Sequence, residues 1–204
     1  MIFFDVEASG LHLTSYPIEV AWVSHDLSRG WSGLIRPATG WGELDWNPES
    51  GKVHGISRHQ LVMVGMDPCE VAARLNADLA GAEVLSDSPG TDGRWLQTLY
   101  AATNIAPSVH ISQSLDVDAM IAESCMRADI PVEDHERLAA ALRAEVGLVA
   151  HRALDDAMDH ALSLGAVAMM EMAKDKGDAA ASTFRLQLVE QARGVLRHHG
   201  RGAP

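Results

Sequence analysis

The stretch that decides the fold is the first eleven residues, Met1-Ile-Phe-Phe-Asp-Val-Glu-Ala-Ser-Gly-Leu11. An apolar run at residues 2–4 is too short for a helix and predicts a buried strand. Asp5 and Glu7 follow it two positions apart, so their side chains point to the same face of the strand. Two buried acids on one face are unfavourable unless a positive group joins them, and hard divalent cations bind carboxylate oxygen. For an isolated D-x-E the better interpretation is a solvated strand end.

Two further acidic segments favour a metal site over that interpretation. Asp92 stands at an expected helix start, after a short apolar run at 84–85 and a loop. Asp156 follows His151 by five residues in His151-Arg-Ala-Leu-Asp-Asp156. Three acidic segments, each at a strand end or a helix start, together with one histidine indicate a single site built from distant parts of the chain.

Four segments in order resemble the motifs of the DEDDh 3′–5′ exonucleases, the family that holds the proofreading epsilon subunit and oligoribonuclease. Phe4-Asp-Val-Glu-Ala-Ser-Gly-Leu11 resembles D-x-E-T-G-L, and Val53-His-Gly-Ile56 resembles V-H-G-I. Ser86-Asp-Ser-Pro-Gly-Thr-Asp-Gly-Arg-Trp-Leu96 is similar to the oligoribonuclease-type segment, and His151 to Asp156 fits H-x-x-x-x-D. The resemblance spans roughly residues 1–164. Each motif alone is weak evidence, whereas four in the family's order are strong evidence.

The resemblance implies a metal-dependent exonuclease that removes nucleotides from the 3′ end of single-stranded RNA or DNA, with RNA or short oligonucleotides slightly favoured. It implies that two Mg²⁺ or Mn²⁺ ions are held by Asp5, Glu7, Asp92 and Asp156. Two ions about 3.5–4 Å apart can clamp a scissile phosphate between the attacking and leaving oxygens. His151 is implied as the general base, a role that suits imidazole because its reference pKa is about 6.5.

The same resemblance implies the substrate contacts. His54, Gly55 and Ile56 are expected to border the terminal nucleotide, Leu11 to contact its base, and Ser9 to replace a threonine hydroxyl of the family motif. The alternatives are ordinary structural roles: Leu11 and Ile56 in the core, and His54 as a hydrogen-bonded or surface histidine.

Two positions need a choice or depart from the family pattern. Asp87 falls where the family usually has Asn, and its extra charge is expected to weaken substrate binding or to alter metal preference. Asp155 and Asp156 are adjacent, and the family spacing selects Asp156 as the ligand. Asp155 is then a solvated charge or a helix N-terminal charge, where a carboxylate is favourable.

Composition limits the class of protein. The chain has 204 residues, a hydrophobic content of 47% and a formal net charge of −12, which opposes broad salt-driven affinity for long nucleic acid. It has no apolar stretch of membrane-spanning length, and its first strand leaves no room for a cleavable signal peptide, so no membrane contact is expected. Cys69 and Cys125 have no metal-site spacing and predict free thiols in a cytoplasmic protein.

The predicted fold is α/β: a mixed five-stranded sheet flanked by helices, with a C-terminal helical extension. The resemblance implies that this sheet is the RNase H-like core of the exonucleases. We expect an exonuclease domain at 1–174 and an amphipathic helix with a frayed tail at 175–204. The predicted strands are 2–6, 18–26, 31–36, 83–86 and 108–112, and the predicted helices are 57–63, 68–80, 92–102, 117–128, 133–146 and 154–173, with 37–56 as a loop.

The C-terminal helix carries an apolar stripe formed by Phe184, Leu188, Ala192 and Val195. An amphipathic helix must cover something. It packs either on its own core or on a second copy of the chain, in a homodimer.

Two classes of function follow. The first is an active 3′–5′ exonuclease, and the alternative is a catalytically degenerate module of the same fold that binds nucleic acid or a protein. Degeneration usually removes a metal ligand. All five active residues implied by the resemblance are present, which favours the enzyme.

Overall fold

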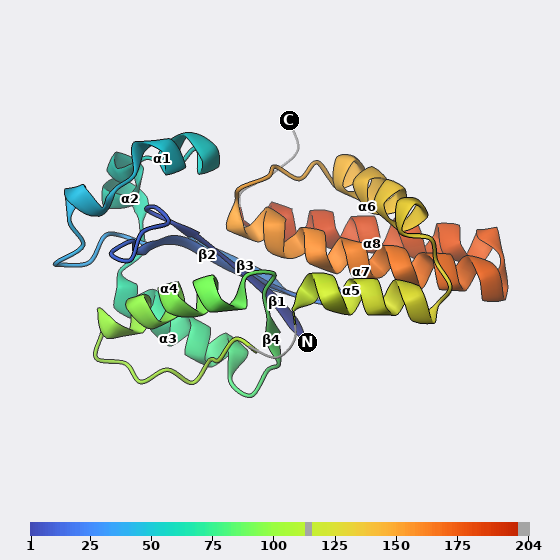
Figure 1. Ribbon diagram of the computed structural model, residues 1–204, viewed down its shortest axis with the longest axis horizontal. Helices are drawn as coiled ribbons and strands as arrows, with labels where there is room; N and C mark the ends of the chain where they lie inside the picture. The colour runs from blue at the N-terminus through green and yellow to red at the C-terminus, as the bar shows by residue number, and fades with distance from the viewer. Residues whose placement is uncertain (113–115, 200–204) are drawn as a thin grey trace.

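A mixed four-stranded sheet forms the centre of the computed structural model, which describes residues 1–112 and 116–199 (Figure 1). The strand order is β3-β2-β1-β4, with bounds Ile2–Ala8 (β1), Pro17–Ser24 (β2), Gly30–Leu34 (β3) and Val84–Leu85 (β4). Strand β1 is antiparallel to β2 and parallel to β4. The meander of three strands followed by alternating elements agrees with the sequence prediction.

The predicted fifth strand is wrong. In the expected segment 108–112, Ile111 makes a single parallel bridge with Val84 and no further ladder among the described residues. Strand β4 is only two residues long and offers little edge for pairing. Pro107, just before the segment, lacks the N–H that a ladder needs.

Helices surround the sheet. Their bounds are Pro48–His54 (α1), Arg58–Val64 (α2), Pro68–Leu79 (α3), Pro89–Ala101 (α4), Val117–Arg127 (α5), Val132–Val146 (α6), Ala153–Lys176 (α7) and Asp178–His198 (α8). The segment predicted as a loop contains α1 and a 3-10 turn at Glu43–Asp45. Asn47 starts α1 because its side chain accepts a hydrogen bond from the backbone N–H of Glu49, and Pro48 occupies the first turn. None of the described helices combines the length and the apolar character that crossing a membrane requires.

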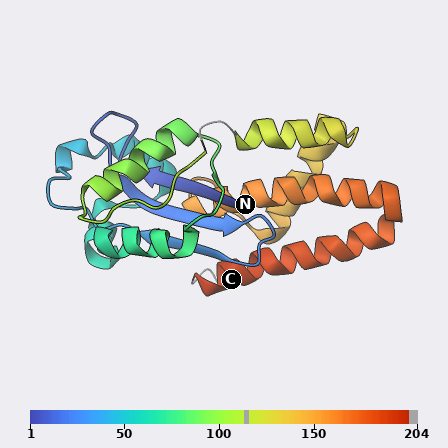
Figure 2. The same ribbon diagram turned by 90° about the horizontal axis from the view of Figure 1, so that it is seen from below.

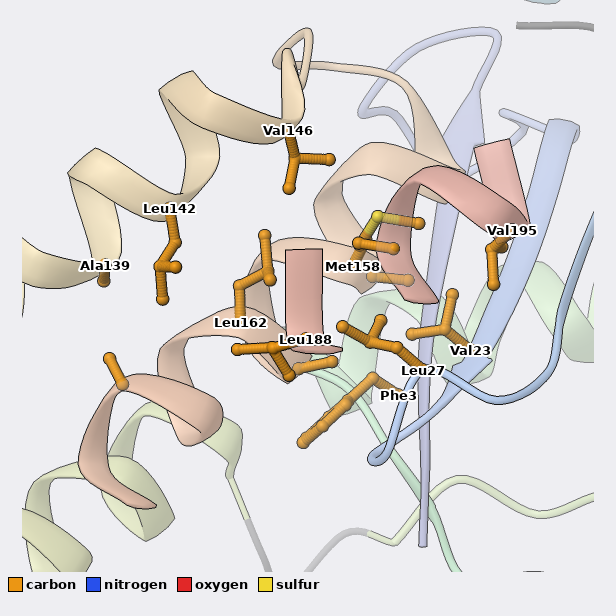
Figure 3. Packing of buried hydrophobic residues seen from close by; sticks show 14 of the residues in the cluster. Phe3, Val23, Leu27, Ala139, Leu142, Val146, Met158, Leu162, Leu188 and Val195 are labelled. Carbon is orange, nitrogen blue, oxygen red and sulfur yellow. The ribbon is translucent and has the colours of Figure 1, made fainter. Parts of the chain in front are cut away.

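Alternation along β1 divides the core into two layers. Phe4 and Val6 face a cluster that includes residues of α3 and α4, whereas Phe3 faces a cluster built with α5, α6, α7 and α8. Figures 1 and 2 show these two sets of helices on opposite sides of the sheet. Figure 3 shows Phe3 and Val23 of the sheet with Met158, Leu162 and Leu188 of the α7–α8 layer. Asp5 and Glu7 have the parity of Phe3, so their side chains lie on the face that α7 covers.

Helices α7 and α8 form an antiparallel hairpin around a single joint, Gly177, which has a positive φ of 84° (Figure 2). A Cβ at Gly165 would lie 2.6 Å from Leu188 Cδ2, so glycine permits the close approach of the two helices. The stripe residues Leu188, Ala192 and Val195 are buried in the α7 layer, and Phe184 packs against it. Intramolecular packing therefore accounts for the stripe that motivated a homodimer.

Candidate active site

The acidic residues meet at one edge of the sheet. Because β1 and β4 are parallel, the chain leaves both strands at the same edge, where ligand sites of open α/β sheets form. A pocket of about 460 Å³ opens there. Its lining comprises Asp5, Val6, Glu7, Leu11, Asp87, Ser88, Thr91, Asp92, Trp95, His151, Asp156, Asp159 and His160.

The pocket brings together all five residues expected to be catalytic. One atom each from Glu7, His151 and Asp156 lies within 4.8 Å of the others, and the same holds for carboxylate oxygens of Asp5, Asp87 and Asp92. The structure thus separates the acids into two adjoining groups. Asp87, the departure from the family pattern, belongs to the second group.

Different elements hold the two later acids. Asp92 lies in the first turn of α4, where the Ser86 hydroxyl donates a hydrogen bond to its Oδ2. Asp156 lies in the first turn of α7, where its backbone N–H donates to the carbonyl of Arg152 at 3.0 Å. His151 precedes this helix with a φ of 61°, in the left-handed region that non-glycine residues seldom adopt.

Burial and mutual repulsion oppose ionisation of the acids. Burial, the largest cause, and then the charges of Asp92, Glu7 and other carboxylates raise the pKa of Asp5 well above its usual value. Burial and the Asp156 charge raise the pKa of Glu7 to about 7, and burial raises the pKa of Asp92 to about 7 against the lowering effect of Ser86. Burial likewise raises the pKa of Asp156.

These residues fit hard divalent cations. The two groups offer carboxylate oxygens, the ligand type that Mg²⁺ and Mn²⁺ prefer, with the imidazole of His151 beside them. A cation between the two groups would offset the repulsion that raises the acids' pKa values.

The structure reveals a buried ion pair beside the site that the motifs did not suggest. Glu19 of β2 accepts two hydrogen bonds from the guanidinium of Arg152, the residue after His151. The pocket also contains Asp159 and His160, and His160 Nε2 lies 3.9 Å from Asp87 Oδ2. Asp159 and His160 follow Asp156 by three and four positions, so helical spacing in the sequence could have indicated that they lie beside it.

Leu11 alone among the expected substrate contacts lines the pocket, and its side chain is 77% exposed. Ser9 is buried, where it donates to the carbonyl of Asp45 and accepts from the N–H of Tyr16. His54 is buried at the end of α1, where its Nδ1 accepts from the N–H of Ile56. Ile56 packs in the core and Gly55 ends α1 with a positive φ, so these residues serve local structure.

Asp155 is 1% exposed in the first turn of α7. The solvated alternative for this residue is therefore wrong, and the helix N-terminal position holds. Trp95 of α4 packs in the core and also contributes to the pocket lining.

No family model matches the sequence, and no curated relative matches it. Solved structures do match in fold. Exonuclease I of E. coli in a zinc-bound complex with single-stranded DNA aligns with a TM-score of 0.57 at 18% identity, over 90% of this chain and 42% of that one. Exonuclease I of Methylocaldum szegediense aligns with a TM-score of 0.57 at 16% identity, over 90% and 42%.

At these identities the likeness establishes the fold. The chain has the mixed α/β fold of part of exonuclease I, and it spans about 42% of the exonuclease I chains that it matches. Among the exonucleases named in the resemblance, the matches favour neither the epsilon subunit nor oligoribonuclease.

Proposed function

We propose that this chain is a metal-dependent 3′–5′ exonuclease of single-stranded nucleic acid. The observation that carries the proposal is the convergence of Asp5, Glu7, Asp92, Asp156 and His151 in one pocket of an exonuclease I fold. Asp5 and Glu7 come from β1, and Asp92 comes from α4. Asp156 lies in the first turn of α7, and His151 lies just before that helix. We assign the four acids as metal ligands and His151 as general base.

The reaction is hydrolysis of the last phosphodiester bond. A water oxygen forms a bond to phosphorus and the bond to the 3′-oxygen breaks. That oxygen takes a proton from solvent to become the 3′-hydroxyl of the shortened strand, and a nucleoside 5′-monophosphate leaves. Divalent ions held by the acids supply charge neutralisation of the phosphate and of the leaving oxygen. A ring nitrogen of His151 takes the proton from the attacking water. The position of His151 in the Glu7–Asp156 group supports this role.

Single-stranded DNA is the substrate to test first, because some of the matched E. coli exonuclease I structures hold single-stranded DNA, one of them a dA16 oligonucleotide. The sequence resemblance slightly favours RNA or short oligonucleotides. Leu11, exposed at the pocket, is suited to either, since apolar contact with a base does not read its sugar.

The test is a time course on 5′-labelled RNA and DNA oligonucleotides, short and long, with Mg²⁺, Mn²⁺ or EDTA. Asp5→Ala removes a half-buried acid of the pocket, and Asp118→Ala removes an exposed acid of α5 as the control. A ladder that shortens from the 3′ end supports the proposal if EDTA abolishes it, if Asp5→Ala abolishes it, and if Asp118→Ala retains it. Binding without cleavage under any metal contradicts it and favours the degenerate binding module.

A further inference from the structure

A buried ion pair joins the second strand to the start of α7. Glu19 is 3% exposed. Its carboxylate accepts hydrogen bonds from Arg152 Nε at 2.9 Å and from Nη2 at 2.6 Å, and from the backbone N–H of Ala153 at 3.2 Å. Such a two-pronged contact fixes the orientation of both side chains, because the guanidinium fork matches the carboxylate plane.

The pair lies where it can set the geometry of the proposed site. Glu19 is the cross-strand partner of Glu7, so its position on the sheet is tied to a proposed metal ligand. Arg152 follows His151 directly in the chain. The Arg152 carbonyl accepts from the N–H of Asp156 at 3.0 Å, so the backbone of Arg152 also anchors the turn that carries this acid.

The connection compensates for a weak local structure. Arg152 is the N-cap residue of α7, and its side chain makes no capping hydrogen bond. His151 has a left-handed φ, which costs free energy in a non-glycine residue. A conformation of this kind persists when surrounding contacts determine it. Glu19 contacts Arg152 and Ala153, the two residues that directly follow His151.

We propose that Glu19 and Arg152 are positioning residues that hold His151 and Asp156 against Glu7. This inference rests on the proposed exonuclease function and extends it to Glu19, outside the acid motifs, and to Arg152, at an unspecified position of the His151–Asp156 motif. Neither residue lines the pocket, so their effect passes through the backbone of the segment before α7. The competing view is an ion pair that stabilises the fold and has no bearing on the site.

A second ion pair of the same chemistry serves as the matched control. Arg185 of α8 donates from Nε at 2.9 Å and from Nη2 at 2.6 Å to Oε2 of Glu145 of α6, and neither residue lines the pocket that holds the acids. We would compare Arg152→Lys and Glu19→Gln with Arg185→Lys and Glu145→Gln. Lysine keeps the charge but loses the fork.

A double variant separates stability from positioning. Combining Glu19→Gln with Arg152→Met removes both charges, and replacing a buried ion pair with neutral groups is often neutral for stability. The glutamine carbonyl can still accept from the N–H of Ala153. The measurements are the melting temperature, kcat and KM on a labelled oligonucleotide, and the affinity for Mn²⁺ followed by electron paramagnetic resonance without substrate.

We expect Arg152→Lys, Glu19→Gln and the double variant to lower kcat and Mn²⁺ affinity each by about 10- to 100-fold, with KM within about threefold of wild type. The control variants, Arg185→Lys and Glu145→Gln, should keep kcat and Mn²⁺ affinity within about twofold of wild type even when they lose a comparable amount of melting temperature. Wild-type kcat and Mn²⁺ affinity in the double variant would overturn the inference. If wild type cleaves no nucleic acid, the proposed function fails, and the Mn²⁺ affinities still decide the positioning role.

Discussion

Glu7 and Glu19 lie directly opposite each other on β1 and β2, in different electrostatic surroundings. Glu19 is neutralised by the two-pronged contact with Arg152, whereas Glu7 faces Asp156 and His151 in the pocket. The protein thus supplies the counter-charge for one member of a like-charged cross-strand pair. The other member remains with its acidic neighbours, an arrangement suited to a bound cation.

Replacing His151 with Ala is expected to lower kcat by about 10²- to 10⁴-fold, because a general base contributes on this scale. His151 is exposed and four acids remain, so Mn²⁺ affinity and melting temperature should change little. Single-turnover kinetics and Mn²⁺ titration measure the two effects. His25→Ala, at another exposed histidine, is the control. Unchanged turnover in His151→Ala would exclude the assignment.

Asp5→Asn is expected to abolish cleavage and to stabilise the metal-free protein. Burial and four neighbouring carboxylates raise the pKa of Asp5, so its ionised form destabilises the fold at pH 8, and asparagine has no charge to repel. We expect the melting temperature in EDTA at pH 8 to rise by at least about 3 °C. The gain should shrink as pH falls, because a raised pKa favours the protonated form of Asp5 in the folded protein at lower pH. A lower melting temperature at pH 8 would contradict the charge argument.

The stability of the metal-free protein should fall as pH rises. The pKa of Glu7 is about 7 in the folded protein against 4.5 for the free side chain, so the unfolded chain loses its proton first. Stability from this group is fully present below about pH 4.5 and lost by about pH 7, and Asp92 acts in the same direction. Thermal melts in EDTA from pH 5 to 8 measure the effect. Mn²⁺ at pH 8 should restore the melting temperature, and equal melts with and without Mn²⁺ would count against a metal site.

Asp87→Asn should raise the Mn²⁺ concentration that gives half-maximal activity by about 3- to 10-fold, since ligand charge tunes metal affinity. The motivating contact is the group that Asp87 forms with Asp5 and Asp92. KM for an oligonucleotide should fall, because one negative charge near the phosphate path is removed. Activity at saturating Mn²⁺ should stay within about threefold of wild type. An unchanged metal requirement would show that Asp87 is a bystander.

Leu11→Ala should raise KM for oligonucleotides by about 3- to 10-fold with little change in kcat, because an exposed leucine that a bound base partly covers contributes about 1 kcal/mol of apolar contact. Leu13→Ala is the matched control, since Leu13 is 87% exposed and lies outside the pocket lining. Steady-state kinetics on both variants test the contact. Equal KM values in the two variants would remove Leu11 from the substrate site.

Local sequence signals predicted most elements, and the resemblance to the exonuclease motifs selected the acids that the structure brings together in one pocket. The apolar run before Asp5 fixed strand β1, and the helical periodicity near Asp156 fixed α7. The Glu19–Arg152 contact was missed because it joins residues 133 positions apart, and no local pattern encodes such a pair. Ser9, His54 and Ile56 were placed at the substrate by resemblance, whereas their burial depends on the packing of α1. The prediction of a fifth strand was wrong because β4 is too short to pair with a further strand. The length of β4 depends on pairing in the folded sheet, which amino-acid composition does not reveal.

The alternation of β1 has a consequence for how the chain acquires activity. A shift of one residue in its pairing with β2 would turn Phe4 and Val6 toward α7 and bury Asp5 and Glu7 among the aromatic residues of the other layer. The same hydrogen-bonded register therefore controls both the burial of Phe3 and the assembly of the acids. A newly made or misfolded chain with the wrong register would not assemble the acidic pocket, so the proposed activity would be confined to correctly folded molecules.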